Sequence, residues 1–152
     1  MNEPLDSLEL PDDPDEGMSL KATFRYTTLV WITSVLLSPV LIVAMTTFAD
    51  GDFSFAGFFM IVLLIALYGG VLSIPNWLLF FVGVAFITRQ YTKPSHIRWG
   101  AQILAFLLTM GLFFILFGLD DPTFFADDGL LFPAFYLLTL SAAIWYFPLT
   151  RK

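Results

Sequence analysis

The longest uncharged stretch of the sequence, residues 55 to 88, restricts the folds open to this chain more than any other feature. Its main interruptions are Gly69, Gly70, Pro75 and Asn76. About 20 helical residues cross the hydrocarbon core of a bilayer, so the stretch is long enough for one crossing and marginal for two. We therefore predict a membrane protein, in which the number of crossings depends on how this stretch folds.

The composition supports a membrane protein and excludes several kinds of site. Hydrophobic residues make up 58% of the 152 residues and charged residues 13%, and the mean hydropathy is +0.81, which is far from the averages of soluble domains. The chain has no Cys, so disulfides and thiolate chemistry are excluded. The net charge of -6 argues against nucleic acid as a partner, because phosphate contacts need clustered Lys and Arg residues.

The first 20 residues are acidic and hold seven of the 13 Asp and Glu residues. Such a segment has too little apolar surface to fold alone, so residues 1 to 20 are predicted to form a disordered tail. Leu residues that alternate with the acids would also suit docking to a partner, although a solvated tail is the simpler interpretation.

Four apolar segments follow the tail, at residues 26 to 48, 55 to 88, 97 to 118 and 130 to 149. Each is long enough to cross a bilayer as a helix. We predict that residues 21 to 152 form one polytopic transmembrane domain, an all-α bundle of four membrane-spanning helices. The second helix has surplus apolar residues for a single crossing, so it is expected to be long and kinked between Gly69 and Pro75.

The charged residues sort by loop, which predicts the orientation of the bundle. All 13 acidic residues lie in the tail, in the turn with Asp50 and Asp52, or in the loop at residues 120 to 128, and all seven basic residues flank the apolar segments. Cytoplasmic loops collect Lys and Arg, so four crossings place every basic residue and both termini in the cytoplasm.

A second topology remains open, in which residues 55 to 88 cross twice. Pro75 and Asn76 favour a tight turn at residues 73 to 77, and this hairpin would give five spans. Each half would be near the shortest usual span. This topology moves the tail, with Lys21 and Arg25, to the outside, so the charge rule favours four spans.

From residue 55 onward, about two thirds of the chain resembles a type of small polytopic protein of unknown function found in bacteria, especially Bacteroidota. The resemblance lies in the apolar run with Ser73, Ile74 and Pro75, the basic loop RQYTKPSHIR, and the segments AQILAFLLTMGLFFILFG and FPAFYLLTLSAAIWYF. It implies a bacterial inner-membrane protein. It assigns no activity and no site.

The sequence offers no set of residues for catalysis, for a cofactor or for a metal. Apart from Arg98, at the edge of the segment at residues 97 to 118, the apolar segments contain no charged residue or histidine of the kind that marks proton relays and intramembrane active sites. His96 is the only histidine and is interpreted as a surface residue. The serines at positions 34, 38, 73 and 141 have no neighbouring base to activate them. The acidic loop at residues 120 to 128 has the oxygen ligands that Ca²⁺ prefers, but lacks the spacing of an EF-hand.

Three groups of residues are candidates for contacts. Asn76 and Gln102 are amides in apolar surroundings, expected to pack against each other or against another subunit, or to line a polar path. Arg89, Lys93 and Arg98 are candidates for contact with lipid head groups. Small residues spaced four apart allow helices to approach closely within one chain or in a homo-oligomer: Ser34, Ser38, Ala66, Gly70, Ala101 and Ala105, with Gly69 and Ser73.

The leading hypothesis is therefore a small non-enzymatic multi-pass membrane protein that acts through a membrane partner or lipid, as an accessory, assembly or immunity-type protein. The alternative is a channel or transporter subunit that becomes competent by oligomerising, with Asn76 and Gln102 beside a broken helix, as in many transport sites.

Single cysteines introduced into this Cys-free chain test the predicted orientation. With four spans, an impermeant thiol reagent added to intact cells labels Ser54→Cys and Asp127→Cys and leaves Ser7→Cys and Ser95→Cys unlabelled, because the basic loops are cytoplasmic. Permeabilised cells, in which all four positions react, are the control. Labelling of position 7 or 95 in intact cells would contradict the orientation.

Overall fold

The computed structural model describes residues 18 to 50, 54 to 119 and 130 to 149. The regular structure of these residues is helical, which confirms the predicted all-α class. The elements are α1 (Leu20–Asp50), α2 (Phe55–Gln90), α3 (Pro94–Phe113), a π-helical turn η1 (Phe114–Gly118) and α4 (Leu131–Tyr146). Most of the predicted tail, all but residues 18 to 20, and the acidic loop at residues 120 to 128 lie outside the described residues.

Capping residues and a proline explain where the first three helices begin. At α1 the Ser19 hydroxyl accepts a hydrogen bond from the Ala22 N–H at 3.2 Å. At α2 the Ser54 hydroxyl accepts one from the Gly57 N–H at 3.4 Å. Such side chains satisfy N–H groups that have no partner in the first turn. Pro94 opens α3, where its missing N–H removes no helical hydrogen bond.

The last helix is shorter than the predicted segment at residues 130 to 149. It ends at Tyr146 because Pro148 disfavours a helical conformation at the residue before it, and Phe147 is extended, with φ -75° and ψ 133°. By length and composition, α1, α2 and α3 with η1 are able to cross a membrane, and α4 is a shorter apolar helix.

The alternative with a hairpin at residues 73 to 77 is wrong, because α2 is one continuous helix through Pro75. A proline inside a helix removes a single intrahelical hydrogen bond, and contacts with α1 hold this part of α2 in place. The Trp31 indole N–H donates to the Ser73 hydroxyl at 2.9 Å, and the Trp77 ring packs edge-on against Phe24.

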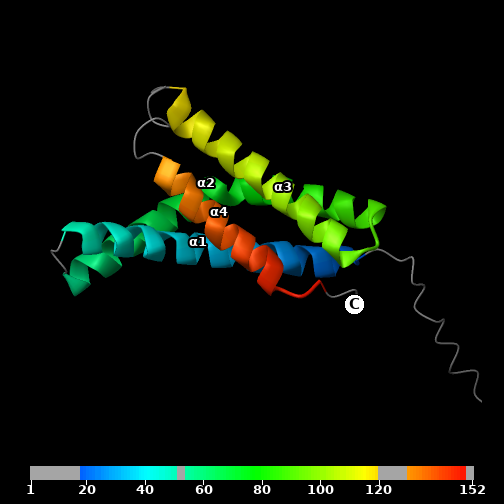
Figure 1. Cartoon of the computed structure of the whole chain (residues 1–152), viewed down its shortest axis with the longest axis horizontal. Helices are drawn as coiled ribbons and strands as arrows, with labels where there is room; N and C mark the ends of the chain where they lie inside the picture. The colour runs from blue at the N-terminus through cyan, green and yellow to red at the C-terminus, as the bar shows by residue number, and fades with distance from the viewer. Residues whose placement is uncertain (1–17, 51–53, 120–129, 150–152) are drawn as a thin grey trace, which may run out of the picture.

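The helices form an antiparallel bundle in which each contacts its two neighbours in the order α1, α2, α3, α4 and back to α1. Figure 1 shows successive helices running in opposite directions, so the start of α1 and the end of α4 lie at the same end. There the Tyr26 hydroxyl donates to the Ile144 carbonyl at 3.0 Å, and the Trp99 and Trp145 rings pack edge to face.

Charge marks this end of the bundle, which we call the basic end. The five basic residues among those described lie near it, in the first turns of α1, at the end of α2 and at the start of α3: Lys21, Arg25, Arg89, Lys93 and Arg98. At the opposite end, α1 finishes at Asp50. The helix order therefore brings together basic residues that are more than 70 positions apart in the sequence.

A cluster of buried hydrophobic residues lies in the half of the bundle near the basic end. We call it the core cluster; its members are Tyr26, Val30, Phe80, Val84, Ala101, Ala105, Ala143 and Ile144. On α2 the buried residues are confined to Phe80, Val84 and Thr88, so residues 55 to 79 of this helix contribute none. In the other half, α1 and α4 still bury Ile42, Val43 and Pro133, but α2 buries no residue. We call this half, which is open along α2, the open half.

Candidate functional site

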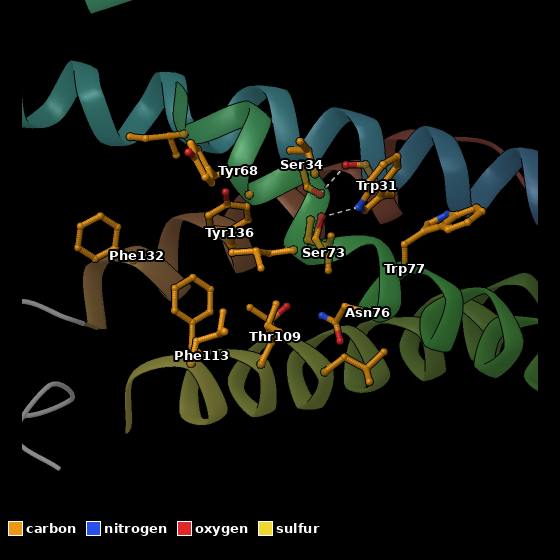
Figure 2. Close-up of a pocket in the computed structure, with 18 of the residues that line it drawn as sticks. Trp31, Ser34, Tyr68, Ser73, Asn76, Trp77, Thr109, Phe113, Phe132 and Tyr136 are labelled. Carbon is orange, nitrogen blue, oxygen red and sulfur yellow. Dashed lines mark hydrogen bonds between the residues drawn. The ribbon is translucent and has the colours of Figure 1, made fainter. Parts of the chain in front are cut away.

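A cavity of about 410 Å³ begins where the core cluster ends and extends into the open half of the bundle. All four helices and η1 line it, and the core residues Phe80 and Ala105 form its inner end. Most of its wall is apolar or aromatic (Figure 2). Its volume lies in the range of small-molecule sites, which is about 300 to 1,000 Å³.

One wall of the cavity is fixed by hydrogen bonds between α1 and α2. The Trp31 indole donates to the Ser73 hydroxyl (Figure 2), and that hydroxyl donates to the Gly70 carbonyl at 3.0 Å. On α1, the Ser34 hydroxyl donates to the Trp31 carbonyl at 2.8 Å. The polar groups of this wall are therefore satisfied within the protein.

Polar groups of α2 and α3 that line the cavity are not satisfied in this way. Among the described residues, neither the Asn76 amide nor the Thr109 hydroxyl has a hydrogen-bond partner, although Thr109 is only 8% exposed. Figure 2 shows the two side chains projecting from α2 and α3 into the same region. The indole N–H of Trp77 is also buried without a partner.

The structure does not join the two amides that the sequence singled out. The Gln102 amide donates to the Ser141 hydroxyl at 2.6 Å, across the α3–α4 interface, and its oxygen is buried without a partner. Gln102 does not line the cavity, whereas Asn76 does. The expectation that Asn76 and Gln102 pack against each other is therefore wrong, and only Asn76 belongs to the cavity.

The small residues of α1 lie at helix interfaces within the chain. Ser38 and Thr139 share a hydrogen bond at 2.6 Å between α1 and α4, and both side chains are buried. Ser34, one turn earlier and also buried, bonds only to its own helix. Ser38 therefore links two helices, and Ser34 does not.

The small residues of α2 and α3 also lie along helix contacts. A Cβ added at Gly70 would lie 3.4 Å from the Val35 side chain of α1, so this glycine lets α1 and α2 approach closely. Ala101 and Ala105 are buried in the core cluster. Ala66 is half-buried.

The candidate head-group residues lie at the basic end, outside the cavity. The Arg98 guanidinium lies 5.5 Å from the centre of the Trp145 ring, a cation–π distance, and its Nε is buried without a partner. Arg89 and Lys93 are exposed. His96 is exposed as well, and its ring packs edge-on against Tyr91.

The chemistry that the cavity offers is recognition of an uncharged group. Its lining contains no Asp, Glu, Lys, Arg or His. Within the described residues, no three His, Cys, Asp or Glu side chains cluster in a way that would hold a metal ion. Sequence reasoning found Asn76 but missed Thr109, Trp31 and Trp77, because nothing in their spacing distinguishes a cavity wall from a packed interface.

No protein-family model, curated protein or solved structure matches this chain. The function is therefore inferred from the cavity, the buried polar groups and the distribution of charge.

We expect Ser38→Ala to destabilise the bundle more than Ser34→Ala. Loss of the Ser38–Thr139 hydrogen bond should lower the free energy of unfolding by about 0.6 kcal/mol and by no more than about 1.7 kcal/mol, the mean and the maximum measured for hydrogen bonds between helices in a membrane protein. Ser34→Ala removes a bond within one helix and is the matched control. Unfolding of purified protein in detergent measures both, and equal losses would contradict the assignment.

Proposed function

We propose that the chain is a four-span integral protein of the bacterial inner membrane with both termini in the cytoplasm. It acts without catalysis, through contacts with another membrane protein or with lipid, as an accessory, assembly or immunity-type protein. The open half of the bundle is the part that makes these contacts. The resemblance of its C-terminal two thirds to small polytopic bacterial proteins supports the choice of membrane.

The distribution of side chains supports a lipid environment. Large apolar side chains such as Leu63, Leu67 and Leu107 are exposed along the described helices, although soluble monomers rarely expose large apolar patches. Hydroxyl-bearing side chains are buried beside the apolar core, as in membrane bundles, where small and polar residues mediate helix contacts. The buried ones are Thr23, Thr27, Ser34, Ser38, Thr88, Thr109 and Thr139.

The basic end supports the proposed orientation, because positive residues next to a span favour the cytoplasmic side. The length of α2 supports its predicted kink. A straight helix of 36 residues is about 54 Å long, whereas the hydrocarbon core is roughly 30 Å thick. Tilting or kinking between Gly69 and Pro75 would fit the helix to the bilayer.

The observation that carries the proposed mode of action is the lack of buried residues in residues 55 to 79 of α2. A helix inside a stable bundle buries one face, as the last third of α2 does. The first two thirds contact α1 on one side and border the cavity on another. This surface is therefore available for a partner.

Photocrosslinking in living cells tests this mode of action. A photoreactive residue at Leu67 of α2 should give a discrete adduct with a membrane protein or one lipid species, because this part of α2 is uncovered. The same residue at Leu107 of α3 is the control, because the two side chains are similarly exposed, at 65% and 61%. The same mixture of bulk-lipid adducts at both positions would contradict the proposal.

A second function, a channel or transporter subunit that works as a homo-oligomer, is favoured by one observation. The Asn76 amide lines the cavity and has no partner among the described residues, and a polar side chain at membrane depth is typical of a transport path. Four spans are few for a carrier that works alone, so a path would have to form between subunits.

Flux measurements in proteoliposomes test this second function. A channel or carrier would conduct a small solute or ion, and Asn76→Leu would abolish the flux because it removes the polar group from the path. Gln102→Leu, which removes an amide outside the cavity, is the control. Absence of flux from the unmodified protein, or equal flux in both variants, would contradict a transport role.

A further inference from the structure

We propose that the cavity binds one uncharged amphiphilic lipid, whose single hydroxyl or carbonyl group hydrogen-bonds to Asn76 and Thr109. The apolar part of this lipid fills the aromatic remainder of the cavity. The inference deepens the proposed function and rests on its membrane placement, because the ligand enters from the bilayer.

The polar part of the ligand is inferred from the two side chains that lack partners. Asn76 is half-buried, Thr109 is 8% exposed, and neither side chain has a hydrogen-bond partner among the described residues, so each can pair with a polar atom that enters the cavity. Asn76 and Thr109 come from neighbouring helices and project into the same region (Figure 2). One oxygen placed between them would accept a hydrogen bond from the amide N–H and bond to the hydroxyl. It would thereby give a partner to the amide N–H and to the hydroxyl.

The absence of charge on the ligand follows from the cavity wall. The lining residues include no Asp, Glu, Lys, Arg or His, and the only ionisable side chains among them are Tyr68 and Tyr136. A charged head group would lose its hydration there without gaining a counter-charge, which is strongly unfavourable. Phosphate, carboxylate and ammonium head groups are therefore excluded from the position beside Asn76.

The apolar part of the ligand is inferred from the rest of the wall. Beyond the two polar groups, rings of Trp31, Phe80 and Phe113 and aliphatic side chains line a volume of about 410 Å³. Water would satisfy Asn76 but would gain little from these side chains, and apolar cavities stay dry. A hydrocarbon chain or ring gains contact with the whole wall.

A route of entry exists on the lipid-facing side of the open half. Two of the residues that line the cavity are also exposed on the surface, Tyr68 of α2 at 63% and Phe132 of α4 at 43%. The Tyr136 side chain of α4 lies against Gly69 of α2 across the bundle. A lipid can therefore reach the cavity at the exposed Tyr68 and Phe132 side chains without leaving the bilayer.

Tryptophan fluorescence provides the test, because two of the four Trp residues line the cavity. A background with Trp99→Phe and Trp145→Phe retains only Trp31 and Trp77 as reporters. The purified protein in detergent micelles is titrated with dibrominated octadecanol, which quenches a nearby indole. Dibrominated octadecane, which has no polar group, and dibrominated stearate, which is charged, are the matched probes.

We expect saturable quenching by the alcohol, with at least a threefold lower apparent Kd than for the alkane or the carboxylate. Asn76→Leu and the isosteric Thr109→Val should each raise the Kd for the alcohol about 2- to 10-fold, the effect of one hydrogen bond, and leave the Kd for the alkane unchanged. Gln102→Leu, outside the cavity, should change neither. Circular dichroism of each variant identifies any that fail to fold, and Thr109→Val is the mildest of them.

Two results would overturn the lipid site. One is quenching by the alcohol that does not saturate. The other is an equal Kd for the alcohol and the alkane, or a Kd for the alcohol that neither cavity variant changes. Neither result affects the cysteine labelling that tests the orientation or the crosslinking that tests the partner surface, so failure of the site is distinguishable from failure of the proposed function.

Discussion

Close approach of helix backbones at small residues is the contact on which the rest of the bundle depends. Ala101, Ala105 and Ala143 lie in the core cluster, and a Cβ added at Gly100 would lie 3.2 Å from the Ile87 side chain of α2. In lipid, such close contacts replace the hydrophobic effect as the force that holds helices together.

Farther along the bundle, several residues that line the cavity are large and aromatic, including Phe113, Phe117 and Tyr136. Small residues still bring α1 and α2 together there, at Gly70, whereas the walls on α3, η1 and α4 consist mainly of large side chains that line the cavity.

Hydrogen bonds between helices then determine which walls of the cavity are fixed. The helix α1 is linked to α2 through Trp31 and Ser73 and to α4 through Ser38 and Thr139. The hydroxyl of Thr139 also donates to its own backbone, at 3.1 Å from the Phe135 carbonyl, and such bonds within one helix are general for Ser and Thr in apolar surroundings. The α3 wall of the cavity has no comparable link. Its hydroxyl, on Thr109, is left for a ligand.

The sequence predicted the positions of the helices well, because segment length and loop charge are local properties. It did not decide between one helix and a hairpin at Pro75. That outcome depends on contacts with Trp31 and Phe24 in another helix, which are tertiary. The predicted last helix was too long, although Pro148 indicates that a helix should end before it. Of the cavity it identified only Asn76, as a polar residue in an apolar run. Whether that amide meets another amide, a hydroxyl or an empty space depends on the rotation of each helix, which a hydropathy pattern does not specify.

The position of the polar groups favours binding over conduction in a single chain. Conduction needs polar groups free to bind solute at successive depths along the bundle, whereas the amide of Asn76 and the hydroxyl of Thr109, which lack partners among the described residues, project into the same region. Toward the basic end the cavity is closed by the core cluster, in which Val30, Val84 and Ile144 are fully buried. Toward the other end the cavity is lined by aromatic side chains. A site with a closed inner end and an opening to the side has the geometry of a lipid site, and a path through the membrane would have to run between subunits.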